Sequence, residues 1–175
     1  MTITSYYDYL VRARRDLWVF LETISDAELS KSVLSGSRFH CIKDLLLHIP
    51  VVEDSWIHED ILRDQPIWEI ALPIENPQDG PHYASTSLEI ILRYWRAVER
   101  STLAYLEKLN PSELERLVTV NGSKGPEHFT VEGLLWHVVQ HETRHTAQVS
   151  ILARQLGFTP PQLDLIGYLP VRANP

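Results

Sequence analysis

The chain has 175 residues, of which 44% are hydrophobic and 22% are charged, and its formal net charge at pH 7 is −7. This length favours a single domain over residues 1–175, and the composition excludes a disordered chain. Nucleic-acid binding is not expected, because it requires clustered Lys and Arg. The one basic cluster, Arg12 to Arg15, lies on a predicted helix flanked by acids and is interpreted as a solvated face.

The cysteine content and the absence of targeting segments predict a cytoplasmic protein. Cys41 is the single cysteine, so no internal disulfide forms. Its apolar neighbours near a helix start favour a small buried side chain over a reactive thiol. The sequence has no signal peptide and no apolar run of 18 residues, so no membrane association is expected.

The first half of the chain predicts two amphipathic helices. Apolar residues recur every three or four positions over residues 5–23, and a connection with one helical turn at residues 26–30 follows. The second helix is expected over residues 40–63. Pro50 lies inside it, where it removes one backbone hydrogen bond and is expected to kink the helix.

The second half predicts two further helices. Residues 64–85 contain four prolines and form a long crossing loop. A capping box at Thr86-Ser-Leu-Glu89 begins the third helix, which runs to about residue 109. A short strand over residues 117–120 and turn residues lead into the fourth helix, residues 130–156, with Thr130 as N-cap and Gly157 after its end.

These elements predict an all-α four-helix bundle without a convincing sheet. The long loop lets the second and third helices run parallel, whereas a short connection would force them antiparallel.

Two histidines of the fourth helix lie in its apolar stripe. With His137 set at zero, His141 and His145 fall at about 40° and 80°, among apolar residues at about 60° to 120°. Imidazoles spaced i, i+4 can bind one metal ion, although they could instead be buried histidines hydrogen-bonded to their neighbours, or be solvated if the apolar stripe is rotated. His48 borders the buried sector of the second helix and is the third candidate ligand.

The residues His141-Glu142-Thr143-Arg144-His145 also match the HExxH signature of zinc proteases, with Glu142 as general base. That interpretation needs a third ligand downstream, and the chain has no His or Glu after His145. The protease match is therefore interpreted as mostly coincidence. A three-histidine site in the bundle core would suit zinc, nickel or iron and would leave a position open for water or substrate.

Two motif blocks carry a family resemblance. The sequence DLLLHIPVVEDSW around His48, with LLWHVVQHETRHTAQV and then RQLGFTPPQLDLIGYL, resembles the DinB family. The resemblance implies a bundle with up-down-down-up topology, often a homodimer, and a divalent metal on His48, His141 and His145. Two features depart from the family pattern: Pro50 interrupts a usually unbroken helix, and Arg38-Phe39-His40 replaces the usual Ser or Thr cap.

Three further residues flank the predicted site. His137 matches a histidine present in many family members and could bind metal or touch a small-molecule substrate. Glu142, at about 140°, could act as a base or orient a ligand, although pairing with a neighbouring helix is the favoured interpretation. Gln148, at about 20°, could also orient a ligand.

The resemblance implies several activities. Some members resemble metal-dependent thiol transferases that use low-molecular-weight thiols, and others resemble hydrolases. A metal enzyme that activates a small thiol, or secondarily water, is therefore expected, and the alternative is a metal-binding, dimerising module without turnover. A second face of the fourth helix is apolar or small and is expected to pack on another helix, in the same bundle or in a second subunit: Trp136, Val139, Thr143, Ala147 and Ser150.

Overall fold

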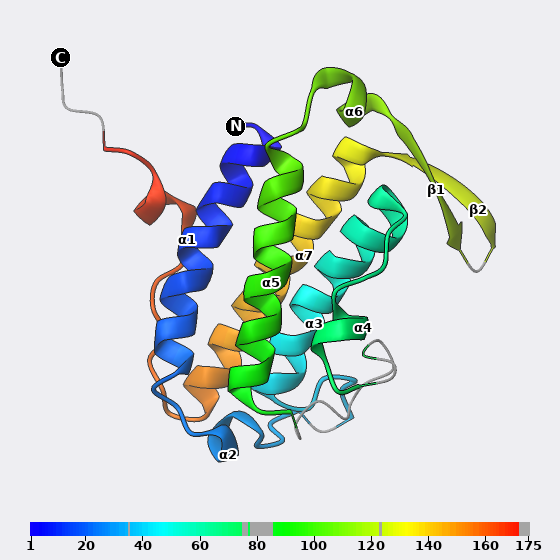
Figure 1. The fold of residues 1–175 in the computed structure, drawn as a ribbon. Coiled ribbons are helices and arrows are strands. Elements are labelled where there is room, and N and C mark those ends of the chain that lie inside the picture. The colour runs from blue at the N-terminus through cyan, green and yellow to red at the C-terminus, as the bar shows by residue number, and fades with distance from the viewer. Residues whose placement is uncertain (35, 75–76, 78–85, 123, 172–175) are drawn as a thin grey trace.

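The computed structural model describes residues 1–34, 36–74, 77, 86–122 and 124–171. Four long helices form its body: α1 (Ile3–Leu21), α3 (Ile42–Asp54), α5 (Leu88–Leu106) and α7 (Val131–Gln155). In Figure 1, α1 and α7 run away from the end that carries the N-terminus, whereas α3 and α5 run toward it. The predicted up-down-down-up bundle is therefore confirmed, with α3 and α5 parallel on either side of the long connection.

The helix ends agree with the capping residues in the sequence. The Thr130 side chain accepts a hydrogen bond from the Gly133 N–H and begins α7, and Gly157, with a φ of 89°, follows its end. The first turn of α5 is capped by Ser87, one residue after the predicted Thr86. A hydroxyl at either position could cap the helix, and only the backbone direction decides between them.

The second predicted helix continues through Pro50 and changes its geometry later. A π-helical segment, Ser55–Leu62, follows α3 directly. Cys41 is the N-cap of α3 and is 1% exposed, as predicted, and burial raises its pKa to about 11. The carboxylate of Asp44 accepts hydrogen bonds from the N–H groups of His40 and Cys41, which ties the chain before α3 to the first turn of the helix.

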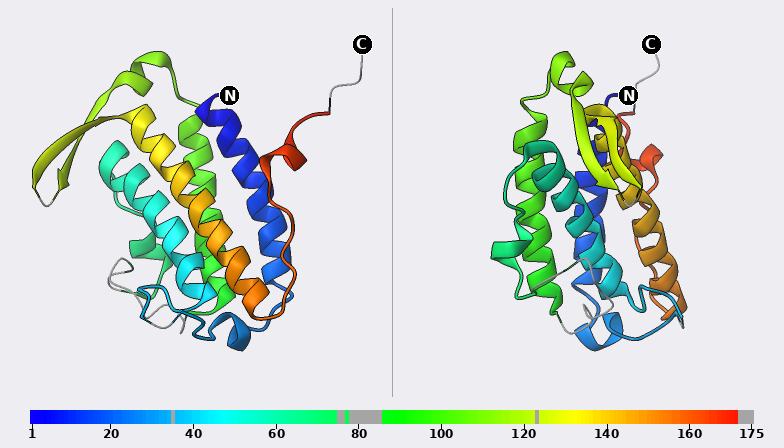
Figure 2. Two further views of the ribbon diagram at one scale, coloured as in Figure 1. Left: turned by 180° about the vertical axis from the view of Figure 1, so that it is seen from behind. Right: turned by 90° about the vertical axis from the view of Figure 1, so that its right-hand side faces the viewer.

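A β-hairpin precedes α7, and the sequence predicts only the first of its two strands. β1 (Leu117–Gly122) pairs antiparallel with β2 (Gly125–Thr130), and Figure 2 shows the hairpin projecting sideways from the bundle, near the end that carries the N-terminus. The residues of β2 are exposed or partly exposed, so its sequence carries no alternation of apolar and polar residues. The remaining short elements are α2 (Asp26–Leu29), α4 (Trp68–Ala71), α6 (Pro111–Glu115) and a 3₁₀ turn (Leu165–Tyr168).

The core contains a buried charged cluster that links all four long helices. Arg14 of α1, with a fully buried side chain, contacts Glu53 of α3, Glu99 of α5 and Glu142 of α7. The prediction that Arg12 to Arg15 form a solvated face is therefore wrong for Arg14. Helical phase explains the error, because Arg14 lies four positions after buried Leu10, within the apolar stripe.

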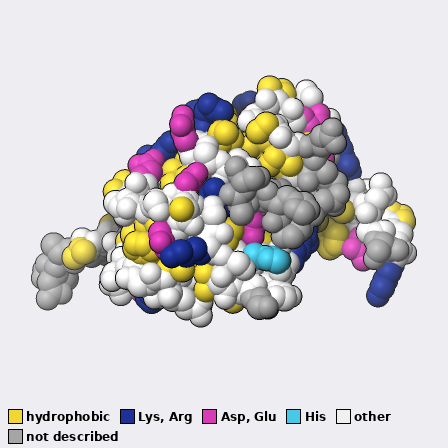
Figure 3. Space-filling view, turned by 90° about the horizontal axis from the view of Figure 1, so that it is seen from below, with side chains coloured by type: hydrophobic (Ala, Val, Ile, Leu, Met, Phe, Trp, Pro, Cys, Tyr) yellow, Lys and Arg dark blue, Asp and Glu magenta, His cyan; other side chains and the backbone are white. Residues whose placement is uncertain are grey.

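The outer surface carries charges of both signs. On the end of the bundle seen in Figure 3, basic and acidic side chains are interspersed with apolar and uncharged ones. Among the described residues, no helix combines the length and the apolar character that crossing a membrane requires.

Candidate metal centre

The structure brings His48 of α3 together with His141 and His145 of α7. One nitrogen from each ring lies within 4.8 Å of the others, and the Nε2 atoms of His48 and His141 are 3.0 Å apart. His141 and His145 are each 6% exposed, and His48 is partly exposed. The three rings thus meet between two packed helices at the rim of the core.

Hydrogen bonding determines which nitrogen each ring presents. Nδ1 of His145 lies 2.6 Å from the Gln148 side-chain oxygen, so Nδ1–H donates and the lone pair remains on Nε2. His48 and His141 already face each other through Nε2. Two nitrogens bound to one zinc ion at about 2.0–2.1 Å in tetrahedral geometry lie about 3.3 Å apart, so the donor set fits a metal ion.

The protonation state of the rings also fits metal binding. Burial, together with the charges of neighbouring groups, lowers the pKa of His48 to about 3 and that of His141 to about 2. Burial lowers the pKa of His145 as well. Neutral imidazole is the form that binds metals, so these rings offer lone pairs without first losing a proton near pH 7.

Phe39 and a fourth histidine, His137, lie beside the three histidines. The Phe39 ring centroid lies 4.4 Å from that of His48 and 5.8 Å from that of His145. His137 is exposed, and its ring lies 6.1 Å from His141 and 5.2 Å from Trp56. His137 is therefore a neighbour of the three-histidine group and not a member of it.

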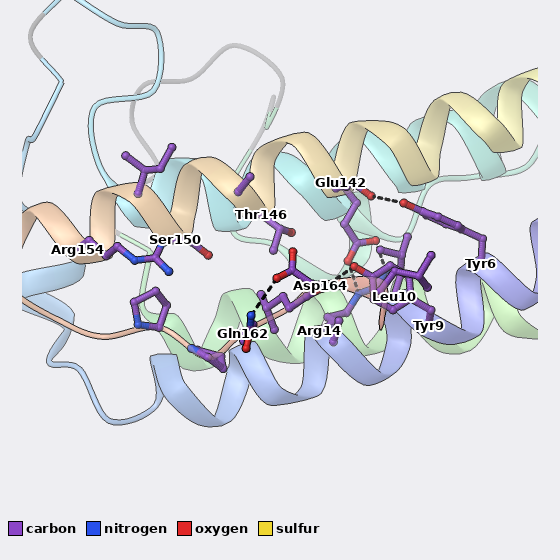
Figure 4. A pocket seen from close by; sticks show the side chains of 18 residues that line it. Tyr6, Tyr9, Leu10, Arg14, Glu142, Thr146, Ser150, Arg154, Gln162 and Asp164 are labelled. Atoms are coloured by element: carbon purple, nitrogen blue, oxygen red, sulfur yellow. Dashed lines mark hydrogen bonds and ion pairs between the residues drawn. The ribbon is translucent and has the colours of Figure 1, made fainter. Parts of the chain in front are cut away.

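Glu142 points away from the histidines toward α1. Its two carboxylate oxygens accept hydrogen bonds from Nε and Nη2 of Arg14, at 2.9 Å and 2.6 Å, and the two side chains face each other in Figure 4. These contacts correspond to the favoured interpretation, pairing with a neighbouring helix. A protease mechanism would require this carboxylate beside the metal, so the geometry gives the HExxH interpretation no support.

A groove of about 610 Å³ lies on the α1 side of α7, between these helices and residues 160–165 (Figure 4). Thr143, Ala147 and Ser150 line it, and the Thr143 hydroxyl contacts the Tyr6 hydroxyl of α1. Thr143 and Trp136 of the predicted packing face thus meet α1 of the same chain, whereas Ala147 is exposed. The histidines lie against α3 and take no part in the groove.

Sequence reasoning missed Arg14, Phe39 and Arg144 near these sites. The phase of Arg14 within the apolar stripe was a usable signal. Phe39 lies before α3 in a segment without periodicity, so no pattern could place its ring. Arg144 has the sequence context of an ordinary exposed residue, and only the 3.4 Å distance from its Nη2 to Nε2 of His145 distinguishes it.

The fold and the site define a class of helical-bundle proteins in which three histidines from two helices could hold a metal ion. The chain belongs to the DinB family, whose family model matches residues 1–173.

Solved structures similar to this one support the same fold. A conserved protein from Enterococcus faecalis superposes with a TM-score of 0.70 at 17% identity, over 89% of this chain and 97% of that one. A DinB-like protein from Bacillus cereus superposes with a TM-score of 0.63 at 18% identity, over 90% of this chain and 94% of that one. YfiT from Bacillus subtilis superposes with a TM-score of 0.65 at 17% identity, over 90% of this chain and 89% of that one. It is described as a probable metal-dependent hydrolase with an unusual four-helix bundle topology. Among curated proteins, none matches the chain.

Proposed function

We propose that His48, His141 and His145 bind one divalent metal ion through Nε2 and that the protein uses it to activate a small thiol. The convergence of three neutral imidazoles within 4.8 Å is the observation that carries this proposal. Imidazole ligands suit zinc, nickel and iron alike, so the donor set leaves the choice among these metals open. The single buried cysteine suits action in the cytoplasm, as the sequence predicts.

The surroundings of the three histidines favour thiol over water as the nucleophile. A divalent cation with a free coordination position acidifies a thiol or water that binds to it and so supplies a nucleophile near neutral pH. A free thiol has a pKa of about 8.5 and needs a much smaller shift than free water, whose pKa is about 15.7. The nearest carboxylate in sequence, Glu142, is occupied by Arg14. S-transfer to an electrophile is therefore the favoured reaction.

Hydrolysis is the second candidate, and His137 favours it. Its exposed ring lies beside His141, and burial lowers its pKa, so it is neutral and able to accept a proton from water. The similarity to YfiT, described as a probable metal-dependent hydrolase, supports the same alternative.

A metal-binding module without turnover is the alternative outside catalysis. In this case, the metal would stabilise a homodimer, the assembly that the family resemblance implies.

The decisive experiment loads the metal-free protein with zinc, nickel or iron(II) and measures metal per chain. Consumption of 2-mercaptoethanol by an activated aryl chloride is then followed. The thiol sulfur forms a bond to the aryl carbon, chloride leaves, and the thiol proton passes to the buffer. Turnover by the loaded wild-type protein that is lost in His145→Ala supports S-transfer. Hydrolysis of an activated ester without thiol turnover would favour the second candidate, and metal uptake without either reaction would favour the non-catalytic module.

A further inference from the structure

Arg144 lies beside the three histidines without an acidic partner among the residues that the structure describes. It precedes His145 on α7, is exposed to solvent, and its Nη2 lies 3.4 Å from Nε2 of His145. The acid nearest to it in sequence, Glu142, is held by Arg14. A guanidinium at the edge of a buried polar site is thus available to a ligand.

The contact between Arg144 and His145 cannot coexist with a metal ion on the same nitrogen. The side-chain oxygen of Gln148 already accepts a hydrogen bond from Nδ1–H of His145, so the lone pair of that ring is on Nε2. A guanidinium has only donors and needs that lone pair as acceptor. Once the lone pair is used by a metal ion, Arg144 loses its acceptor and remains as a cation next to a divalent cation.

The charge of Arg144 acts on the whole site. Burial is the largest cause of the lowered pKa of His48, His137, His141 and His145. The positive charge of Arg144 lowers the same four pKa values further. Two neighbouring cations repel each other, and an anion placed between them relieves the repulsion.

A second guanidinium lies near the site. Arg38 lies over the ring of Phe39, 5.5 Å from its centroid, and that ring packs on His48. Its charge also contributes to the lowered pKa of His48. Positive charge from α7 and from the segment before α3 therefore acts on His48.

We propose that Arg144 binds an anionic group, a carboxylate or a phosphate, of the substrate whose nucleophile is activated at the three-histidine site. The inference rests on the proposed metal site and specifies its substrate class. Planar guanidinium donors match both oxyanions, which is why arginine recognises them. Phe39, whose ring packs on His48, would contact the apolar part of such a substrate.

The test measures thiol binding by spectroscopy and does not need turnover. The protein is loaded with cobalt(II), and thiolate binding is followed by the near-ultraviolet charge-transfer band. Three thiols serve as probes: neutral 2-mercaptoethanol, mercaptoacetate with a carboxylate, and inorganic thiophosphate. The quantity of interest is the affinity for each anionic thiol divided by that for 2-mercaptoethanol, because this ratio removes effects on the metal itself.

Arg144→Gln should lower this ratio about fivefold, the effect of one partly exposed ion pair, while the protein still binds one cobalt per chain. Arg144→Lys should keep part of the preference, because it retains the charge without the planar fork. Arg154→Gln is the matched control, since Arg154 lies on the same helix and is exposed on the groove side. It should leave the ratio unchanged.

The arms of the experiment separate the possible outcomes. If Arg144→Gln lowers the affinity ratio for mercaptoacetate alone, the site binds a carboxylate. If it lowers the ratio for thiophosphate alone, the site binds a phosphate. Cobalt binding with an unchanged ratio in Arg144→Gln, or an equal drop in Arg154→Gln, would overturn the inference and leave the proposed function intact. A wild-type protein that binds no cobalt would overturn both.

Discussion

Nε2 of His48 and Nε2 of His141 lie 3.0 Å apart although 93 positions separate them in the chain. His48 is in α3 and His141 in α7, and those helices pack against each other along the bundle. Two neutral imidazoles in this arrangement either share one proton or direct both lone pairs at one point. A cation at that point would satisfy both rings and His145 together.

Replacement of any one of the three histidines by Ala should abolish stoichiometric metal binding. We expect each of His48→Ala, His141→Ala and His145→Ala to lower zinc affinity more than about 100-fold, because loss of an outer partner alone costs 10- to 100-fold. Competition with a chromophoric chelator measures the affinity. His128→Ala is the control, since His128 is exposed on β2 and bonds Thr119. Retained metal in any of the three variants would reject that residue as a ligand.

Gln148 is expected to act on the metal through His145. Gln148→Leu removes the acceptor of the Nδ1–H, which frees the ring to rotate and change tautomer, and should weaken zinc binding about 10- to 100-fold. Gln148→Glu keeps an acceptor and should retain affinity. Gln140→Leu, at an exposed position of the same helix, controls for the change in surface polarity. Equal affinities for Gln148→Leu and Gln140→Leu would show that the hydrogen bond has no role.

Arg14 is expected to be essential for stability. Arg14→Met leaves Glu53, Glu99 and Glu142 buried without their shared cation and should lower the free energy of unfolding by about 3–5 kcal/mol. For a chain of this length, the melting temperature should fall by about 10 °C. Circular dichroism during heating measures it. Arg12→Met, at an exposed position, should change the melting temperature little, and a similar small effect of Arg14→Met would contradict the assigned role.

Glu142→Gln separates a structural from a catalytic role for this carboxylate. Loss of its charge beside buried Arg14 should destabilise the protein by about 3 kcal/mol. Thiol turnover per bound metal should stay near the wild-type value at a temperature well below the transition. Unfolding curves and the aryl chloride assay measure the two quantities. A normal unfolding curve combined with lost turnover would instead identify Glu142 as the base.

His58 should make stability depend on pH. Its Nδ1 lies 2.7 Å from Oδ1 of Asp54; burial lowers its pKa, but the hydrogen bond and the charge of Asp54 outweigh burial and raise it above 6.5. A raised histidine pKa stabilises the fold below the unfolded pKa of about 6.5 and loses this contribution as pH rises through the folded pKa. The stability gap between wild type and His58→Gln, measured by urea denaturation, should therefore be larger at pH 6 than at pH 9. A gap that grows with pH would contradict this assignment.

Periodicity and capping residues were sufficient for much of the fold. The α7 stripe, the Thr130 cap and Gly157 gave the fourth helix its correct span, and the length of residues 64–85 predicted the parallel pair α3 and α5. These features depend on local backbone chemistry, which short stretches of sequence encode. The β2 strand and the π-helical segment were missed, because neither has a periodic pattern of buried side chains.

The sequence by itself determined which faces of α3 and α7 are apolar, and hence that His48, His141 and His145 were candidates for one site. Only the tertiary structure decided that their Nε2 atoms face one another, that Gln148 fixes the tautomer of His145 and that Glu142 turns to Arg14. The physical reason is that helical phase places a side chain on a face within about one turn, whereas ligand and ion-pair contacts depend on how helices distant in sequence pack and rotate against each other.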